Sequence, residues 1–144
     1  MEQTITAPDG ADVEFIATLL ANAGRLVQEL AGAALTGTEA DLALLQRTLD
    51  SGALQRDATP PLQALGIAFG ALFSTLNPEY DWCMVEDEYG RDPAIRYRDT
   101  TLLLFPLTML SKRIEEDGHV DVAGLYHGLR EQLDDIIGEH YADA

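Results

Sequence analysis

The chain has 144 residues, of which 25 are acidic and 9 are basic, and its formal net charge is −16 at pH 7. This length suits a single domain, residues 1–144, with its own hydrophobic core. The acidic balance argues against nucleic acid as a partner, because phosphate binding requires a basic surface. It would attract a basic protein, a basic peptide or a small cation instead, and the same charge also simply keeps a protein soluble. The single cysteine excludes an internal disulfide. We recognise no secretory signal and no apolar run long enough to span a membrane, so we expect a cytoplasmic protein without a membrane partner.

Two amphipathic helices are expected in the first third of the chain. Asp9 or Asp12 can cap the first helix, which ends at Gly32. Thr38 then opens a second helix, with Asp41 at the capping-box position. Both helices carry apolar residues at spacings of three and four, which is typical of one buried face. These stripes are Val13, Ile16, Leu20, Ala23, Val27 and Leu30 in the first helix, and Leu42, Leu45 and Leu49 in the second.

A third helix is expected from Thr59 to about Leu76. Thr59 supplies a capping hydroxyl, and Pro60 follows at a position where its missing N–H costs nothing. The segment is apolar on most faces, which indicates a central helix. Gly66 and Gly70 lie four residues apart, and we expect them to permit close packing of a neighbouring element rather than the approach of a ligand.

The apolar pattern then changes from helical to alternating, which predicts a β-hairpin. If Tyr89 and Gly90 are the central residues of its turn, the two strands share one apolar face and one mixed face. A third strand over Thr101–Phe105 has no polar alternation, which suits a strand covered on both faces. The apolar face of the hairpin holds Trp82, Met84, Ile95 and Tyr97, and the mixed face holds Cys83, Val85, Asp87, Ala94, Arg96 and Arg98.

Two helices follow the predicted sheet. Pro106 begins a fourth helix that continues to Asp117, and Asp121 caps a fifth. The element order is therefore three N-terminal helices, a small antiparallel sheet of about three strands and two C-terminal helices. We expect an α+β fold.

Three runs of residues carry a resemblance to a known family. They read LQALGIAFGALF, W-x-x-V-E-D-E-Y-G-R-D-P-A and FPLTMLSKRIEEDG-x-V-D, and they lie between about Leu62 and Leu125. Together they resemble a bacterial domain family known only as a domain of unknown function. The resemblance implies no reaction, and residues 1–58 carry no motif of it. Its motif positions in this chain are Trp82, Asp87, Glu88, Gly90, Arg91, Pro106, Lys112 and Arg113.

Candidate catalytic and metal-binding groups are few. Cys83 could act as a nucleophile with a distant histidine, but no helix start or basic neighbour would activate it, so we expect a small packed side chain. The histidines His119, His127 and His140 lack the spacing of a helical zinc site. Acidic side chains of the hairpin alternate between its faces, which favours a solvated tip over a Ca²⁺ or Mg²⁺ site. We expect neither a metal nor a cofactor.

A basic cluster stands out against the acidic background. Its members are Arg91, Arg96, Arg98, Lys112 and Arg113. They could neutralise nearby carboxylates in ordinary pairs, as the four-residue spacing of Arg113 and Asp117 on one helix suggests. They could also hold a carboxylate or phosphate. Both alternatives stay open, with internal pairing favoured.

These features favour a non-enzymatic acidic binding protein, of which the most specific form is an immunity-type or adaptor partner of a basic bacterial protein. The alternative is a small-ligand-binding or enzymatic domain in which the cluster around Arg96 and Lys112 holds an anion. A third hypothesis is an acidic homodimer that resembles a secretion chaperone, which shares the size and charge but not this element order. The residues expected to bind a partner or ligand are Trp82, Asp87, Glu88, Arg91, Arg96, Arg98, Lys112 and Arg113.

Overall fold

The computed structural model describes residues 3–142 and has an α+β fold, as expected. Its strands form one antiparallel sheet in the order β1-β2-β3-β4. The sheet therefore has four strands where the sequence predicts about three, because a short strand before the first helix pairs with the hairpin. The elements are β1 (Thr4–Thr6), α1 (Gly10–Ala31), α2 (Asp41–Leu49), α3 (Thr59–Leu76), β2 (Tyr80–Asp87), β3 (Gly90–Tyr97), β4 (Leu103–Leu104), the 3-10 turn η1 (Pro106–Thr108), α4 (Met109–Asp117) and α5 (Val122–His140).

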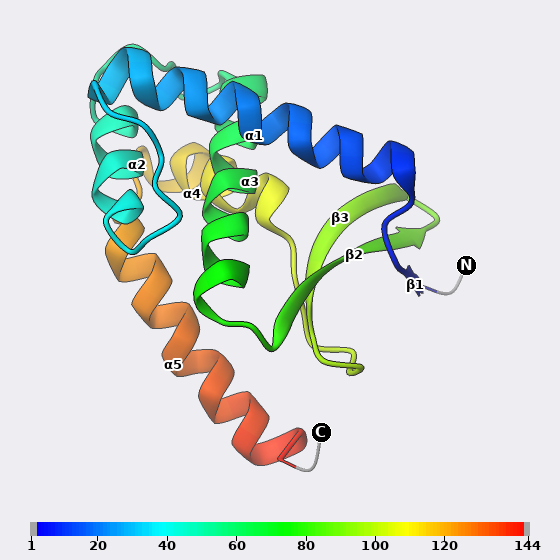
Figure 1. The fold of residues 1–144 in the computed structure, drawn as a ribbon. Helices are drawn as coiled ribbons and strands as arrows, with labels where there is room; N and C mark the ends of the chain where they lie inside the picture. Colours follow the sequence, from blue (N-terminus) through cyan, green and yellow to red (C-terminus); the bar gives the residue numbers. More distant parts are fainter. Residues whose placement is uncertain (1–2, 143–144) are drawn as a thin grey trace.

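Helix α3 lies at the centre of the molecule, and the other elements are arranged around it (Figure 1). Helix α1 crosses its N-terminal end, the β2–β3 hairpin extends from its C-terminal end, and α5 runs on the other side of it from the sheet. The side chains of Leu65, Phe69 and Phe73 on α3 are almost fully buried. The expectation of a central third helix is thus confirmed, and it follows from a segment too apolar to leave in water.

Helix α1 begins and ends as its sequence predicts. Asp9 is its N-cap, and its carboxylate accepts from the backbone N–H of Asp12 at 2.9 Å. The Asp12 carboxylate accepts in return from the N–H of Asp9, which completes a capping box. Gly32 ends the helix with φ 73°, a left-handed conformation that glycine adopts without strain.

Helices α2 and α3 have different caps from those expected. The N-cap of α2 is Ala40 rather than Thr38, because the Asp41 carboxylate accepts hydrogen bonds from the N–H groups of Thr36 and Gly37, both at 2.8 Å. Asp41 therefore holds the preceding loop. In α3, Thr59 lies inside the first turn, where its hydroxyl donates to the Asp57 carbonyl at 3.3 Å and leaves the N-terminus without a side-chain cap.

The hairpin register differs from the predicted one by two residues. Asp87 pairs with Gly90, so the turn residues are Glu88 and Tyr89. A shift of two residues returns every side chain to the same face, so the predicted faces agree with the structure. Tyr80, Trp82, Ile95 and Tyr97 belong to the main core, whereas Cys83, Val85 and Ala94 form a second small core with Ile5 and Leu103.

Strand β4 is shorter and less covered than expected. It pairs only Leu103 and Leu104 with β3, both are half-buried, and it lies at the edge of the sheet. The prediction of a five-residue strand covered on both faces is therefore wrong. A sharp turn in which Arg98 adopts φ 45° precedes the strand and Pro106 begins η1 just after it, so little chain remains to pair.

The C-terminal helices follow their predicted boundaries, except that the first turn of the fourth is the 3-10 turn η1. Asp121 caps α5 by accepting from the N–H of Gly124 at 3.0 Å. Within residues 3–142, no helix combines the length and the apolar character needed to cross a bilayer.

Candidate functional site

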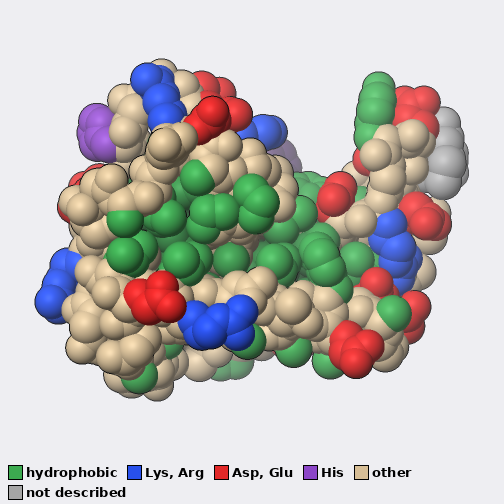
Figure 2. All heavy atoms as spheres, turned by 90° about the horizontal axis from the view of Figure 1, so that it is seen from above, with side chains coloured by type: hydrophobic (Ala, Val, Ile, Leu, Met, Phe, Trp, Pro, Cys, Tyr) green, Lys and Arg blue, Asp and Glu red, His purple; other side chains and the backbone are tan. Residues whose placement is uncertain are grey.

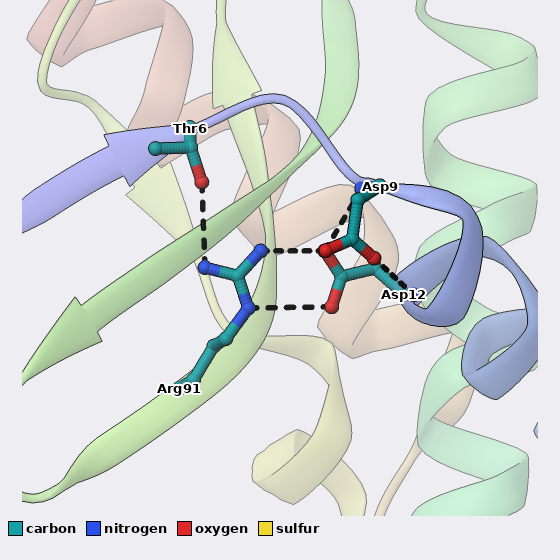
Figure 3. Close-up of polar contacts among 4 residues, drawn as sticks. All are labelled: Thr6, Asp9, Asp12 and Arg91. Carbon is teal, nitrogen blue, oxygen red and sulfur yellow. Dashed lines mark hydrogen bonds and ion pairs between the residues drawn. The ribbon is translucent and has the colours of Figure 1, made fainter.

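Arg91 ties the hairpin to the start of α1 (Figure 3). Its Nη2 lies 2.5 Å from Oδ2 of Asp12, and its Nε donates to Oδ1 of Asp12 at 3.3 Å. Its Nη1 also donates to the Thr6 hydroxyl at 3.5 Å. One guanidinium therefore joins β1, β3 and the capping box of α1.

This pair changes the titration of both members. The side chain of Asp12 is only 11% exposed, and such a carboxylate requires hydrogen bonds to remain charged. The hydrogen bond from Arg91, followed by the one from the Asp9 N–H, lowers the pKa of Asp12 below its usual value. The same bond raises the pKa of Arg91. Arg91 is thus engaged within the protein, with a residue far away in the sequence.

Arg96 and Arg98 lie at the opposite end of the hairpin. The Nε of Arg96 donates to the Thr100 carbonyl at 2.5 Å, and the guanidinium of Arg98 lies 5.4 Å from the ring centre of Tyr97. Both arginines line a cavity of about 200 Å³ that also contains Asp81 and Asp99. The two positive charges in this cavity are accompanied by two negative ones.

Lys112 and Arg113 lie apart from the arginines of the hairpin. They project from α4 into a groove of about 390 Å³ beside β4. The predicted ion pair between Arg113 and Asp117 does not form, because no guanidinium nitrogen of Arg113 lies within 4.0 Å of a carboxylate oxygen of Asp117. The five cations thus occupy three places, and the cavities around Arg96 and around Lys112 have different linings.

The remaining expected site residues belong to the hairpin. Trp82 is half-buried and packs against the main core. Asp87 accepts from the backbone N–H of Tyr89 at 2.8 Å and so stabilises the turn. Glu88 is exposed at the tip beside Tyr89, whose side chain is 89% exposed. Trp82 and Asp87 have structural roles, whereas Glu88 and Tyr89 are available at the surface.

The groups considered for catalysis do not come together. Cys83 is 5% exposed, and burial raises the pKa of its thiol, which disfavours the reactive thiolate. All three histidines are exposed, and none lies on the hairpin. In the part of the chain that the structure describes, no group of three His, Cys, Asp or Glu side chains could hold a metal ion.

Exposed carboxylates define a surface that the sequence motifs do not indicate. The C-terminal half of α5 carries four exposed acidic side chains, which we call the acidic face of α5: Glu131, Asp134, Asp135 and Glu139. Among residues 3–142, none of these four carboxylates lies within 4.0 Å of an arginine or lysine as an ion pair, and the bridge from Arg91 to Asp12 lies away from α5, at the start of α1. The charge of Asp134 also acts on the protein itself: burial first, and then this charge, raises the pKa of Tyr80 to about 12. The acidic face is therefore largely uncompensated.

An apolar surface lies on another side of the molecule. Seen from above, hydrophobic side chains form a broad band with charged side chains along its border (Figure 2). Between helices α1 and α3, the side chains of Leu19, Leu26, Pro60, Pro61 and Ala64 line a groove of about 310 Å³. Exposed apolar areas of this kind are common where proteins meet a partner.

Comparisons with known proteins place the chain in a family but assign it no activity. A family model described as a domain of unknown function (DUF3806) matches residues 41–126, and so includes α2, which precedes the expected region. A crystal structure at 1.50 Å from Bacteroides thetaiotaomicron VPI-5482 is similar with a TM-score of 0.81 and 16% identity, over 92% of this chain and 48% of that chain. At this identity the similarity shows the fold alone, and this chain spans about half the length of that protein. No curated protein matches significantly.

Proposed function

Because the chain belongs to the family described as a domain of unknown function (DUF3806), which prescribes no reaction, we propose a function from its surface: a non-enzymatic acidic protein that binds a basic protein. The observation that carries this proposal is the acidic face of α5. Its carboxylates are exposed, and no arginine or lysine among residues 3–142 pairs with them, although Oε2 of Glu139 lies 3.6 Å from Nε2 of the exposed His140. Unpaired surface charge retains its long-range field, which attracts and orients a partner of opposite charge.

The apolar band supports the same proposal. Charge alone accelerates an encounter, whereas a stable complex also needs a desolvated apolar centre. The groove between α1 and α3 offers apolar side chains next to Arg25 and Glu29, a combination typical of an interface with a polar rim. The apolar groove and the acidic face of α5 lie on different sides of the molecule, so using both requires a partner large enough to reach them, which favours a protein over a small basic molecule.

The most specific form of the proposal is an immunity-type or adaptor protein that neutralises a basic bacterial partner in the cytoplasm. Such a protein must bind fast, and the high net charge of −16 supplies the steering that this requires. The alternative, an anion site around Arg96 and Lys112, is less well supported because Arg96 and Lys112 line separate cavities.

Affinity capture from the native host at low ionic strength tests the proposal. Immobilised wild-type protein should retain a basic protein that elutes as salt rises. The variant with a neutral α5 face combines Glu131→Gln, Asp134→Asn, Asp135→Asn and Glu139→Gln. It should lose most of its capacity to retain the basic protein. The control removes four exposed carboxylates outside this face, by combining Glu14→Gln, Asp50→Asn, Asp57→Asn and Asp92→Asn, and it should still retain the basic protein. Capture of no basic protein, or equal losses in both variants, would show the proposal to be wrong.

A further inference from the structure

The groove beside β4 has the form of a site for an extended peptide. One wall is the edge strand with its continuation, Leu103 to Phe105, and the other is the outward side of α4, including Met109, Lys112 and Arg113. Its volume of about 390 Å³ lies within the usual range for ligand-binding clefts. Phe105 is 39% exposed here, although it is a large hydrophobic side chain.

The strand side of the groove offers backbone hydrogen-bonding groups. The N–H of Tyr97 donates to the Leu102 carbonyl at 3.0 Å, so these residues stand at a hydrogen-bonded position of the ladder, although the Leu102 N–H donates to the Thr100 hydroxyl instead. Such pairs alternate along antiparallel strands, and Leu103 opposite Arg96 is therefore a non-bonded pair. The N–H and C=O of Leu103 then point away from β3, toward an edge that no described strand occupies. An unpaired edge of this kind accepts a further strand.

The helix side of the groove offers positive charge. Lys112 and Arg113 are exposed, and neither forms an ion pair with a carboxylate among residues 3–142. The groove contains one carboxylate, that of Glu116, against these two cations. In a chain of net charge −16, two adjacent cations without ion-pair partners form a local exception that would complement a carboxylate from outside.

Internal packing fixes the position of this groove. Pro106 lies against Gly66 and Gly70 of α3, where a Cβ on Gly66 would stand 2.3 Å from the Pro106 carbonyl oxygen. This close packing of Pro106 against α3 fixes the position of η1, and therefore the position at which α4 begins beside β4. The residues Pro106, Met109, Lys112 and Arg113 of the P-x-x-M-x-x-K-R motif thus have a common role: Pro106 anchors the turn, and the other three line the groove.

We propose that this groove binds an extended segment of a partner protein, which adds a strand to the edge of β4 and places a carboxylate side chain against Lys112 and Arg113. Backbone hydrogen bonds to the β4 edge would supply affinity, and alternate side chains would supply specificity. One of these would contact Met109 and Phe105, and the acidic one would meet the two cations. This acidic, apolar segment differs in chemistry from the basic partner proposed for the α5 face, so the inference goes beyond that proposal.

Selection from a displayed library of random twelve-residue peptides tests the inference. Wild-type protein should enrich peptides in which an acidic residue stands two positions from an apolar one, because side chains of a strand alternate. Lys112→Glu combined with Arg113→Glu should weaken the affinity for an enriched peptide by about tenfold or more, the loss expected for a charge-assisted hydrogen bond. The control Arg25→Glu with Arg47→Glu makes the same change in net charge at exposed positions outside the groove, and should leave the affinity nearly unchanged.

Amide NMR spectra of the complex locate the peptide independently. The N–H signal of Leu103 should shift and its exchange with solvent should slow, because the proposed strand covers it. Failure to enrich acidic peptides, equal loss of affinity in the two double variants, or an unchanged Leu103 amide in the complex would each overturn the inference. None of these outcomes bears on capture of a basic protein by the α5 face.

Discussion

Gly66 is the residue with the strictest steric requirement. Because its Cβ would stand 2.3 Å from the Pro106 carbonyl oxygen, we expect Gly66→Ala to shift backbone and to cost about 1–3 kcal/mol of stability. Thermal unfolding measures this as a lower melting temperature. Gly128→Ala on α5 is the matched control, since its Cβ would meet nothing within 4 Å, and it should raise stability by up to about 1 kcal/mol. Equal melting temperatures for Gly66→Ala and wild type would contradict close packing there.

Asp12 should make stability depend on pH. Its pKa is lowered in the folded state from an ordinary 3.8, so the charged pair contributes stability that is fully present above about pH 3.8. That contribution is lost as the pH falls through the lower folded-state pKa. Asp12→Asn keeps a hydrogen-bond acceptor for the capping box but removes the charge, and should be less stable than wild type at pH 7.

Urea unfolding of wild type and Asp12→Asn at a series of pH values measures this effect. The difference in unfolding free energy should shrink as the solution becomes more acidic than the ordinary pKa of 3.8. Asp92→Asn changes an exposed carboxylate of the same hairpin and serves as the control. A difference between wild type and Asp12→Asn that stays constant down to strongly acidic pH would rule out the role of the charge.

At the scale of elements, β1 should protect the thiol of Cys83. Ile5 of β1 packs against the small core that contains Cys83, and burial raises the pKa of the thiol. We therefore expect slow reaction with a thiol-specific reagent such as DTNB in the folded protein. Ile5→Ala should accelerate labelling by opening this core, while Val13→Ala, at a 56% exposed position, should not. Fast labelling of wild type, or equal rates for both variants, would contradict the assigned place of β1.

The sequence predicts elements with strong local signals and misses those determined by distant contacts. The apolar stripes of the helices and the alternation of the hairpin follow from periodic burial. The predicted faces of the hairpin are right although its predicted turn is wrong, because a shift of two residues leaves each side chain on the same face. β1 has only three residues, too few for a detectable period, and its strand exists because β2 is beside it. Thr38 and Thr59 do not cap α2 and α3, because their hydroxyls form other local hydrogen bonds, with the Thr36 hydroxyl and with the Asp57 carbonyl.

The site was less predictable than the fold for the same reason. Spacing along α4 suggests that Arg113 pairs with Asp117, yet side chains four residues apart on an exposed helix gain little from pairing. The partner of Arg91 is Asp12, and no short-range pattern links residues so far apart. The motif did draw attention to Lys112 and Arg113, but only the fold places them beside the edge of β4.

For the whole molecule, the net charge of −16 should limit stability. Carboxylates concentrated on a small body repel each other, and monovalent salt at about 0.15 M reduces the screening length to roughly 8 Å. We therefore expect the melting temperature to rise between low and moderate NaCl. The variant with a neutral α5 face should show a weaker salt dependence than wild type. A flat or falling trend in wild type would mean that the carboxylates are compensated in the folded state.

The association rate of the captured basic partner, measured by stopped-flow at several ionic strengths, tests the central claim most directly. If the acidic face of α5 steers the encounter, the association rate constant should fall steeply with salt. Asp134→Lys should lower the association rate constant by a much larger factor than it changes the dissociation rate constant. The folded state should be retained, since Asp134 is exposed. An association rate that is independent of salt and unchanged by Asp134→Lys would contradict the account.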